Sequence, residues 1–281
     1  MIDQTELKHL LLTAINAAIR AGALIMEVYN SDDFQVNLKS DATPLTLADR
    51  LANDEIVKSL MKTRIPVMSE EGRNLLYEER KGWEYFWLVD PLDGTKEFIK
   101  RNGEFTVNIA LVYNGYPIMG IIYIPTLKQL YFSLLELGSY RVDEIISEVR
   151  DVETLNKIIL ETQKLPICLK PAKFTVVTSR SHPSTETQEF IDKLKKVYGE
   201  VQTIPRGSSL KICMVAEGNA DVYPRFGNTS EWDTAAGQSI AEQAGCSMIS
   251  VDDCKRISYN KEDIDNPWFI VKRSEEIVIP K

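Results

Sequence analysis

Three short acidic motifs, far apart in the chain, contain the residue types that bind divalent cations. They are Ser69-Glu70-Glu71-Gly72, Asp90-Pro91-Leu92-Asp93-Gly94-Thr95 and Glu231-Trp232-Asp233-Thr234-Ala235-Ala236-Gly237. Mg²⁺ prefers carboxylate, carbonyl and water oxygens, and it leaves room for a substrate phosphate beside its few protein ligands. Together the motifs predict a Mg²⁺ site that acts on a phosphate ester and that assembles only when the chain folds.

The middle motif carries the most specific chemistry. Pro91 disfavours a helical conformation at Asp90, and Gly94 lets the backbone approach a ligand closely, so that two carboxylates and the Leu92 carbonyl can converge on cations. The amides of Gly94 and Thr95, at the start of a predicted helical turn, are suited to phosphate oxygens. The Thr95 hydroxyl could orient a water, with Glu70 or a second acid as the proton acceptor.

Each motif alone also has a purely structural explanation. A lone Asp-x-x-Asp-Gly is usually a turn, Glu70-Glu71 would be a solvated charge pair, and Asp233 could be a helix N-cap. Because all three motifs occur in one chain, the catalytic explanation is favoured.

The length and net charge of the chain restrict the classes of protein that fit this sequence. The 281 residues, 44% of them hydrophobic, can bury a large core and predict one compact, two-lobed enzyme. The net charge of -8 and the lack of a Lys/Arg-rich run argue against long nucleic acid as a partner. Residues 1–6 lack the basic start of a signal peptide, and we find no uninterrupted apolar stretch long enough to span a bilayer. We therefore expect a cytoplasmic address and no integral membrane segment, while peripheral association with the inner face of the membrane stays open.

Cysteine and histidine usage gives no support to zinc, redox or His-triad chemistry. The four cysteines, Cys168, Cys213, Cys246 and Cys254, show no Cys-x-x-Cys spacing. Only two histidines occur, and His9 is predicted to lie on the surface of an N-terminal helix.

The first lobe is predicted to be α+β and to cover residues 1–165. Apolar periodicity predicts helices over 5–29 and 47–61. Short strands over 65–68 and 85–89 run into Glu70 and Asp90, and sites in layered α/β proteins tend to lie beyond strand ends. Segments 105–113, 118–124 and 129–134 predict an antiparallel meander with a hairpin turn at Asn114-Gly115.

The second lobe is predicted to be α/β and to cover residues 166–281. The charged stretch 136–173 is interpreted as an inter-lobe connection or insertion. Beyond it, strands are predicted over 174–179 and 220–223, and helices over 184–198, 208–217 and 233–244, the last one closed by Gly245. This alternation of strands and helices is typical of an α/β arrangement.

With these motifs in this order, the chain resembles the lithium-sensitive, Mg²⁺-dependent inositol monophosphatase superfamily. The segment Lys39-Ser40-Asp41-Ala42-Thr43-Pro44-Leu45-Thr46-Leu47-Ala48-Asp49 adds to the resemblance. It implies a layered α-β-α-β-α sandwich of the inositol monophosphatase/fructose-1,6-bisphosphatase type, two or three Mg²⁺ ions per active site, and Li⁺ as an inhibitor. By analogy, the metal ligands are Glu70, Asp90, the Leu92 carbonyl, Asp93 and Asp233, and the residues that act on the nucleophilic water are Asp49, Glu70 and Thr95. Taken alone, Asp49 would be a first-turn helix acid stabilised by the macrodipole.

The second-lobe motifs resemble the superfamily members that act on bisphosphate nucleotides. They are Ser179-Arg180-Ser181-His182, Gly207-Ser208-Ser209-Leu210-Lys211 and Tyr223-Pro224-Arg225-Phe226-Gly227. The resemblance implies hydrolysis of the 3'-phosphate of 3'-phosphoadenosine 5'-phosphate to AMP and phosphate by a metal-activated water, with the 5'-phosphosulfate as a further candidate substrate. The expected substrate contacts are Gly94, Thr95, Ser181, His182, Gly207, Ser208, Ser209, Lys211, Arg225 and Asp233. Hydroxyls, helix amides and Lys211 could grip a second phosphate, and Arg225 could add a charge-assisted contact.

Three other functions fit parts of the pattern. An inositol or sugar phosphatase on the same scaffold shares the acidic motifs but gives no reason for the Ser208-Ser209-Lys211 and Arg225 set. A non-catalytic sensor would bind a bisphosphate nucleotide without releasing phosphate. Activity on very short oligonucleotides also stays open, and both a monomer and a homodimer are compatible with the sequence.

Overall fold

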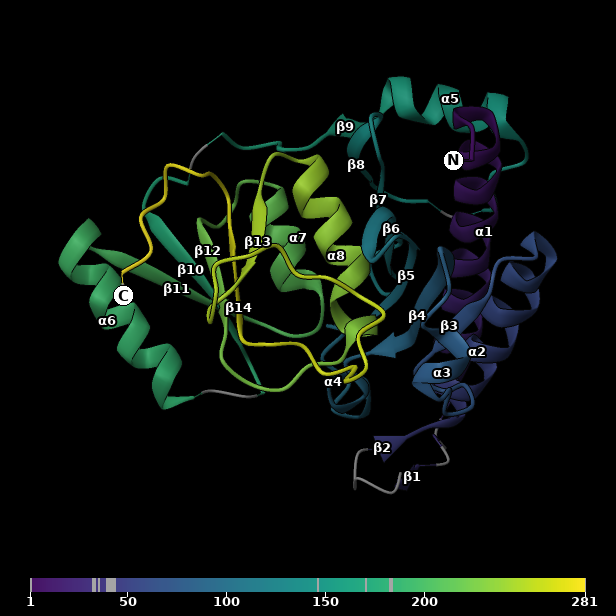
Figure 1. Ribbon diagram of the computed structural model, residues 1–281, viewed down its shortest axis with the longest axis horizontal. Coiled ribbons are helices and arrows are strands. Elements are labelled where there is room, and N and C mark those ends of the chain that lie inside the picture. Colours follow the sequence, from purple (N-terminus) through teal and green to yellow (C-terminus); the bar gives the residue numbers. More distant parts are fainter. Residues whose placement is uncertain are drawn as a thin grey trace.

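The chain folds into five alternating layers of helices and sheets (Figure 1). The computed structural model describes residues 2–31, 34, 36–38, 44–145, 147–169, 171–181 and 184–280. In order, the layers are α1 with α2, a seven-stranded sheet, α7 with α8, a five-stranded sheet, and α6. This arrangement confirms the predicted α-β-α-β-α sandwich.

Two helices form the outer layer of the first lobe. Helix α1 (Gln4–Tyr29) is capped by Asp3, whose carboxylate accepts hydrogen bonds from the Thr5 and Glu6 amides at 2.8 and 2.9 Å. Helix α2 (Leu47–Leu60) lies beside it. Within the described residues, α1 is the one helix long and apolar enough to cross a membrane, a criterion that core helices also meet; 56% of its apolar window is buried here. Arg20 interrupts this apolar run, in agreement with the expectation of no uninterrupted apolar stretch of that length. The buried face of α1 makes it a core helix of this fold.

The seven-stranded sheet has the order β3-β4-β5-β6-β7-β8-β9. Its strands are β3 (Val67–Ser69), β4 (Tyr85–Asp93), β5 (Thr106–Tyr113), β6 (Tyr116–Ile124), β7 (Gln129–Leu134), β8 (Gly138–Val142) and β9 (Gln163–Lys164). Only β3 and β4 pair in parallel. The predicted meander is confirmed, and Asn114 and Gly115 have the positive φ values, 47° and 79°, that a tight hairpin turn needs.

Helices α7 (Leu210–Ala216) and α8 (Glu231–Gln243) lie between the two sheets. Gly120 of β6 lets α8 rest directly on the first sheet, because a Cβ there would lie 2.2 Å from the carbonyl oxygen of Ala236. One hydrophobic cluster accordingly joins Phe86 and Ile122 of the first lobe to Ile240 of α8. The division at residues 165 and 166 stays a prediction, and across it the core is continuous.

The five-stranded sheet has the order β11-β10-β12-β14-β13. Its strands are β10 (Phe174–Ser179), β11 (Val201–Arg206), β12 (Val222–Arg225), β13 (Ser247–Ser250) and β14 (Phe269–Lys272). Helix α6 (Thr185–Tyr198) covers the outer face with Phe190, Ile191 and Leu194. The sequence predicted β10 and β12 but missed β11, β13 and β14.

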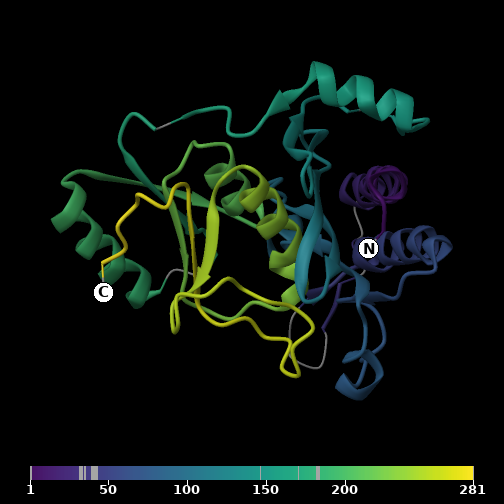
Figure 2. The ribbon, with the colours of Figure 1, turned by 45° about the horizontal axis from the view of Figure 1, so that its top comes forward.

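Residues 136–173, interpreted as an inter-lobe connection or insertion, contain regular elements over much of their length, so a simple connection is excluded there. Strands β8 and β9 extend the first sheet, and helix α5 (Val152–Glu161) lies near α1 (Figure 2). Asn16 of α1 fixes the preceding loop, since its side chain exchanges two hydrogen bonds with the Val149 backbone at 2.8 and 2.7 Å. Short elements complete the fold: β1 (Asn37–Leu38), β2 (Pro44–Leu45), the 3-10 turn Met61–Thr63, α3 (Tyr77–Arg80) and α4 (Thr95–Ile99).

Candidate active site

A pocket between the two lobes collects most of the predicted site residues. Those that line it are Glu70, Asp90, Leu92, Asp93, Gly94, Thr95, Ser181, Gly207, Ser208, Ser209, Lys211, Arg225 and Asp233. They come from the ends of β3, β4, β10 and β12, from the turn before α7, and from the first turn of α8. Asp49 lies behind Thr95, and His182 lies outside the described residues. The fold thus brings together motifs that are more than 150 residues apart in the chain.

The two aspartates of the middle motif belong to β4 itself, not to a loop beyond it. The register of β4 against β5 shifts between Asp90, which faces Asn108, and Asp93, which faces Thr106. Such an irregularity inserts extra residues and re-aims side chains. The Asp90 Oδ1 atom accepts a hydrogen bond from the Leu92 amide at 3.0 Å, so the turn of the strand is held by one of the predicted metal ligands.

The clustered carboxylates oppose one another's ionisation. Asp90 is 1% exposed, and burial, followed by the charges of Glu70, Asp93 and Asp233, raises its pKa well above the usual range. Burial and the nearby Asp93 and Glu70 raise the pKa of Asp233 to about 8. A divalent cation would remove this repulsion.

The donor set fits a hard cation that keeps part of its water shell. In the described part of the chain, no three His, Cys, Asp or Glu side chains are drawn together closely enough to hold one metal ion by themselves. Mg²⁺ is bound in proteins through one or two carboxylates, with water and substrate oxygens completing its octahedron. An open pocket with carboxylates around it therefore suits Mg²⁺ better than a site in which protein ligands surround the ion completely.

Asp49 connects the start of α2 to Thr95. Its Oδ2 atom accepts hydrogen bonds from the Thr46 amide at 2.7 Å and the Thr46 hydroxyl at 2.5 Å. Its Oδ1 atom accepts one from the Thr95 hydroxyl at 3.2 Å. Asp49 is therefore more than a first-turn helix acid, because it also orients a hydroxyl that faces the pocket.

Two buried side chains of β5 that the sequence analysis missed contact this site. Thr106 and Asn108 lie next to Asp93 and to the hydroxyls of Ser208 and Ser209. Both hydroxyls donate to Asp93 Oδ2, at 2.7 and 2.8 Å. A polar pair at positions i and i+2 of an otherwise apolar strand was a readable signal, since such residues share one face of a sheet.

Lys211 and Arg225 supply positive charge to the same pocket. Lys211 is 7% exposed, its ammonium group donates to the Ser208 carbonyl oxygen, and burial lowers its pKa to about 8. Arg225 donates from Nη2 to the Asn228 carbonyl oxygen at 2.7 Å, while its buried Nε has no hydrogen-bond partner among the described residues. Both cations thus retain donor capacity for an anionic ligand.

Two further acids, also missed, hold the second-lobe motifs in place. Ser181 donates its hydroxyl to Glu97. Glu104 accepts a bidentate pair from Arg180, both contacts at 2.8 Å, and a third hydrogen bond from the Gly207 amide at 2.7 Å. Ser181 and Gly207 are therefore already engaged with first-lobe carboxylates at the edge of the pocket.

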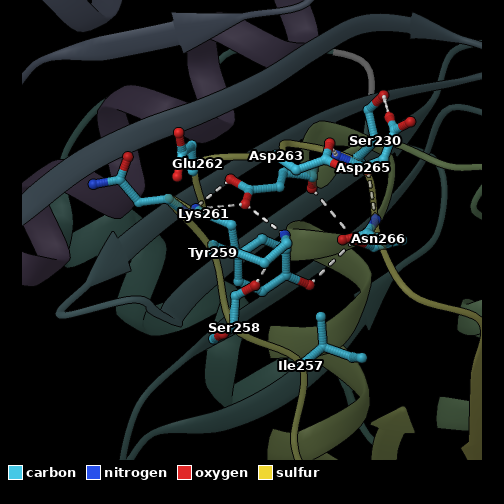
Figure 3. Close-up of polar contacts among 12 residues, drawn as sticks. Ser230, Ile257, Ser258, Tyr259, Lys261, Glu262, Asp263, Asp265 and Asn266 are labelled. Atoms are coloured by element: carbon cyan, nitrogen blue, oxygen red, sulfur yellow. Dashed lines mark hydrogen bonds and ion pairs between the residues drawn. The ribbon is translucent and has the colours of Figure 1, made fainter. Parts of the chain in front are cut away.

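A loop over residues 257–266 contacts the start of α8 (Figure 3). The first turn of this helix carries Asp233. The fully buried Glu231 carboxylate accepts hydrogen bonds from the amides of Asn260 and Lys261 at 2.7 and 2.9 Å, and from the Lys261 ammonium at 2.6 Å. Asn266 donates to the Ser230 carbonyl at 2.7 Å. These contacts fix the helix start from which the Asp233 carboxylate projects.

Comparisons with known proteins agree with this geometry. A model of the inositol monophosphatase family matches residues 6–277. This chain belongs to that family. The predicted resemblance is thereby confirmed over nearly the whole sequence.

Several relatives within the family are similar over almost their full length. The 3'(2'),5'-bisphosphate nucleotidases CysQ of Salmonella typhimurium and Escherichia coli K12 are each 42% identical over 258 residues, which is 90% of this chain and 96% of theirs. The crystal structure of CysQ from Bacteroides thetaiotaomicron superposes with a TM-score of 0.87 at 49% identity, covering 94% of this chain and 97% of that one. An inositol monophosphatase from Anabaena, at 23% identity and a TM-score of 0.67 over 96% of this chain and 92% of its own, shares the fold.

Proposed function

We propose that this chain is a Mg²⁺-dependent phosphatase that removes the 3'-phosphate of 3'-phosphoadenosine 5'-phosphate, giving AMP and phosphate. The observation that carries the proposal is one pocket whose lining combines Glu70, Asp90, Asp93 and Asp233 with Lys211 and Arg225. The CysQ relatives are named as 3'(2'),5'-bisphosphate nucleotidases, and this supports the choice of substrate. The 5'-phosphosulfate of the same nucleotide is a second candidate with the same 3'-phosphate.

The metal ligands would be the oxygen donors of the acidic motifs. Glu70, Asp90, Asp93, Asp233 and the Leu92 carbonyl would hold two or three Mg²⁺ ions. When bound, Mg²⁺ supplies a lowered pKa for the attacking water and positive charge for the phosphate and the leaving oxygen. The raised pKa of the buried Asp90 supports this role, because its ionised form needs a nearby cation.

Thr95 and Asp49 would orient the attacking water. The Thr95 hydroxyl has one proton, and its acceptors are Asp49 Oδ1 at 3.2 Å and the Leu92 carbonyl oxygen at 3.3 Å. With either partner, the Thr95 oxygen is left as a hydrogen-bond acceptor. A water that donates to this oxygen has its own lone pair free to attack phosphorus. Glu70, which lines the same pocket, would accept the proton that the water loses.

Lys211 and Arg225 would bind the second phosphate of the nucleotide. Their hydrogen bonds within the chain go to backbone carbonyl oxygens, so neither charge is neutralised by those bonds. Gly94 and Thr95 would face the phosphate that reacts, and Ser181, Gly207 and the unplaced His182 would lie toward the nucleoside. An inositol monophosphate has no second phosphate for the two cations, and this distinguishes the proposal from the rival sugar phosphatase.

The direct test is phosphate release from 3'-phosphoadenosine 5'-phosphate with Mg²⁺, with and without Li⁺, beside inositol 1-phosphate. We expect fast, Li⁺-inhibited release from the nucleotide and slow release from the inositol phosphate. A preference for inositol phosphate would overturn the roles of Lys211 and Arg225. Tight nucleotide binding with no release from either compound would instead favour the sensor.

The substrate is a small molecule, and long nucleic acid is not expected to bind a chain of net charge -8. A cytoplasmic address, with or without peripheral membrane contact, stays a prediction, as does the choice between monomer and homodimer.

A further inference from the structure

We propose that Thr106 and Asn108 of β5 are positioning residues for the metal site, and that the hydroxyls of Ser208 and Ser209 serve the Asp93 carboxylate and not a substrate phosphate. The inference rests on the proposed function and deepens it, because it reassigns two residues that the sequence placed on the substrate. The proposal concerns the hydrogen bonds that orient the Asp93 carboxylate before a metal ion or substrate binds.

The contacts form one buried network. Thr106 is 0% and Asn108 1% exposed, and their side chains point to the same face of β5. The Asn108 amide donates to Ser209 Oγ at 2.9 Å and reaches Asp93 Oδ2 at 3.4 Å. The Thr106 hydroxyl lies 2.7 Å from Ser208 Oγ and 2.9 Å from Asn108 Oδ1. No solvent is needed to connect these groups, because each lies within direct reach of the next.

The strength of the nearby acceptors indicates which way the serine hydroxyls donate. Each hydroxyl has one proton, and both serine oxygens lie at donating distance from Asp93 Oδ2, 2.7 and 2.8 Å away. The single Thr106 proton has two acceptors within reach, Asn108 Oδ1 and Ser208 Oγ, and the Ser209 proton also has the Asp233 carbonyl oxygen at 3.1 Å. Among the acceptors that face the two serines, the Asp93 carboxylate is the strongest and the closest for Ser209, so it takes both serine protons. Phosphate oxygens accept hydrogen bonds but do not donate them. Hydroxyls that have given their protons to a carboxylate therefore have none to offer a phosphate.

The arrangement leaves one oxygen of Asp93 available. All of its side-chain hydrogen bonds within the described residues end on Oδ2. Three donors on one oxygen fix the rotation of the carboxylate, and Oδ1 keeps its lone pairs for a cation. Hydrogen bonds of this kind to metal ligands commonly affect metal affinity by about 10- to 100-fold.

The network also joins the two lobes at the site. Thr106 and Asn108 belong to the first sheet, while Ser208 and Ser209 form the turn before α7. Ser209 Oγ lies 3.1 Å from the carbonyl oxygen of Asp233 as well. Ser208 has a φ of 51°, in the left-handed region that non-glycine residues rarely adopt, and such backbone strain persists only where surrounding contacts enforce it.

A matched pair of substitutions at Thr106 tests the proposal without substrate. Thr106→Val keeps the shape and removes the hydroxyl, whereas Thr106→Ser keeps the hydroxyl and removes a methyl group. The readout is the rise in Tm as MgCl₂ is titrated at constant ionic strength, from which the Mg²⁺ affinity of the folded state follows. We expect Thr106→Val, Asn108→Ala and Ser209→Ala each to weaken this affinity by about tenfold or more, and Thr106→Ser to keep it near the wild-type value.

The control is Ser239→Ala in α8. It removes a buried hydroxyl bond of the same kind, to Ser133 of β7 at 2.8 Å, away from the carboxylates. We expect its Mg²⁺ affinity to equal that of the wild type, whatever its Tm.

Three results would overturn the proposal. A Ser209→Ala protein that binds Mg²⁺ normally and shows only a raised KM would make Ser209 a substrate ligand. Equal losses for Thr106→Val and Thr106→Ser would show that packing, not the hydroxyl, matters. A wild-type chain whose Tm does not respond to Mg²⁺ would have no such site. The Tm titration contains no nucleotide, so failure of the proposed nucleotidase activity would leave it unaffected and would remove only the comparison of KM values.

Discussion

The pocket has an acidic side (Glu70, Asp90, Asp93 and Asp233) and a basic side (Lys211 and Arg225), and burial shifts the pKa of Asp90 and Asp233 in the opposite direction from the pKa of Lys211. On the acidic side, burial and mutual repulsion raise the pKa of Asp90 and Asp233. On the basic side, burial lowers the pKa of Lys211 to about 8. For these three side chains the protein alone disfavours the charged form.

These opposite pKa shifts indicate which kind of ligand completes the site. Direct ion pairs between the two sides would have relieved both penalties, but Lys211 and Arg225 donate to backbone carbonyls. A ligand that supplies cations to one side and anionic oxygens to the other would relieve both at once. Mg²⁺ together with a bisphosphate nucleotide has this composition.

The largest expected effect is a fall in kcat when one carboxylate charge on the acidic side is removed. Asp93→Asn should lower kcat by about 10³-fold or more, because a lost metal ligand is worth several kcal/mol of transition-state stabilisation. Without Mg²⁺ its Tm should be equal to or above that of the wild type, since one repelling charge is gone. Asp192→Asn, an exposed acid on α6 paired with Lys195, is the matched control and should keep full activity. A kcat of Asp93→Asn close to the wild-type value would contradict the assignment of Asp93 as a metal ligand.

The next largest expected effect is a fall in kcat, and it distinguishes a role in orienting the attacking water from a role in binding the substrate. Thr95→Val keeps the side-chain shape but removes the hydroxyl bonded to Asp49 at 3.2 Å, and kcat should fall by about 10²-fold with KM nearly unchanged. Thr95→Ser, which retains the hydroxyl, should recover most of the rate. Steady-state kinetics on the nucleotide give both constants, and a change confined to KM would contradict the proposed role.

On the basic side, the effect should depend on the substrate. Arg225→Ala should raise KM for 3'-phosphoadenosine 5'-phosphate by about 10- to 100-fold, the usual value of a charge-assisted hydrogen bond. The same change should leave the rate on a compound with a single phosphate nearly unaltered. Arg206→Ala, whose exposed side chain lies outside the pocket lining, serves as the control. Equal losses on both substrates would show that Arg225 does not select for the second phosphate.

The smallest effect is a pH dependence from Lys211. Its pKa of about 8 means that the ammonium is charged below this pH and neutral above it. The value of kcat/KM for the nucleotide should therefore fall by about tenfold per pH unit above pH 8, since this ratio reports groups of the free enzyme. In Lys211→Arg the side-chain charge persists at high pH, so kcat/KM should fall much less steeply above pH 8. A profile that is the same for both proteins would exclude Lys211 from phosphate binding.

Most of the fold could be predicted where local patterns are strong. The apolar periodicity of α1 and the Asn114-Gly115 turn each had a single structural explanation, and both were confirmed. Strands β13 and β14, of four residues each, gave no such signal, because pairing with distant partners and not local pattern forms them. The same holds for β8 and β9, which pair with one another and complete the edge of the first sheet.

The pocket was predictable in its ligand types but not in its support. Carboxylates in sequence motifs can be read directly, and Glu70, Asp90, Asp93 and Asp233 line one pocket. Glu97 and Glu104 gave no sequence signal, because their partners Ser181 and Gly207 belong to the other lobe. Thr106 and Asn108 stood in an apolar strand, where their shared face could have been noticed.

The contact between Gly120 and α8 has a consequence for dividing the protein into fragments. Helix α8 follows the predicted lobe boundary in the chain, yet it lies on the first sheet with the Ala236 carbonyl where a Cβ of Gly120 would be. A fragment ending at residue 165 would leave that face of the sheet bare, and a fragment starting at 166 would expose the matching side of α8. Large uncovered apolar faces favour aggregation, so the two halves should be recovered in soluble form only when they are synthesised together and associate before either is released.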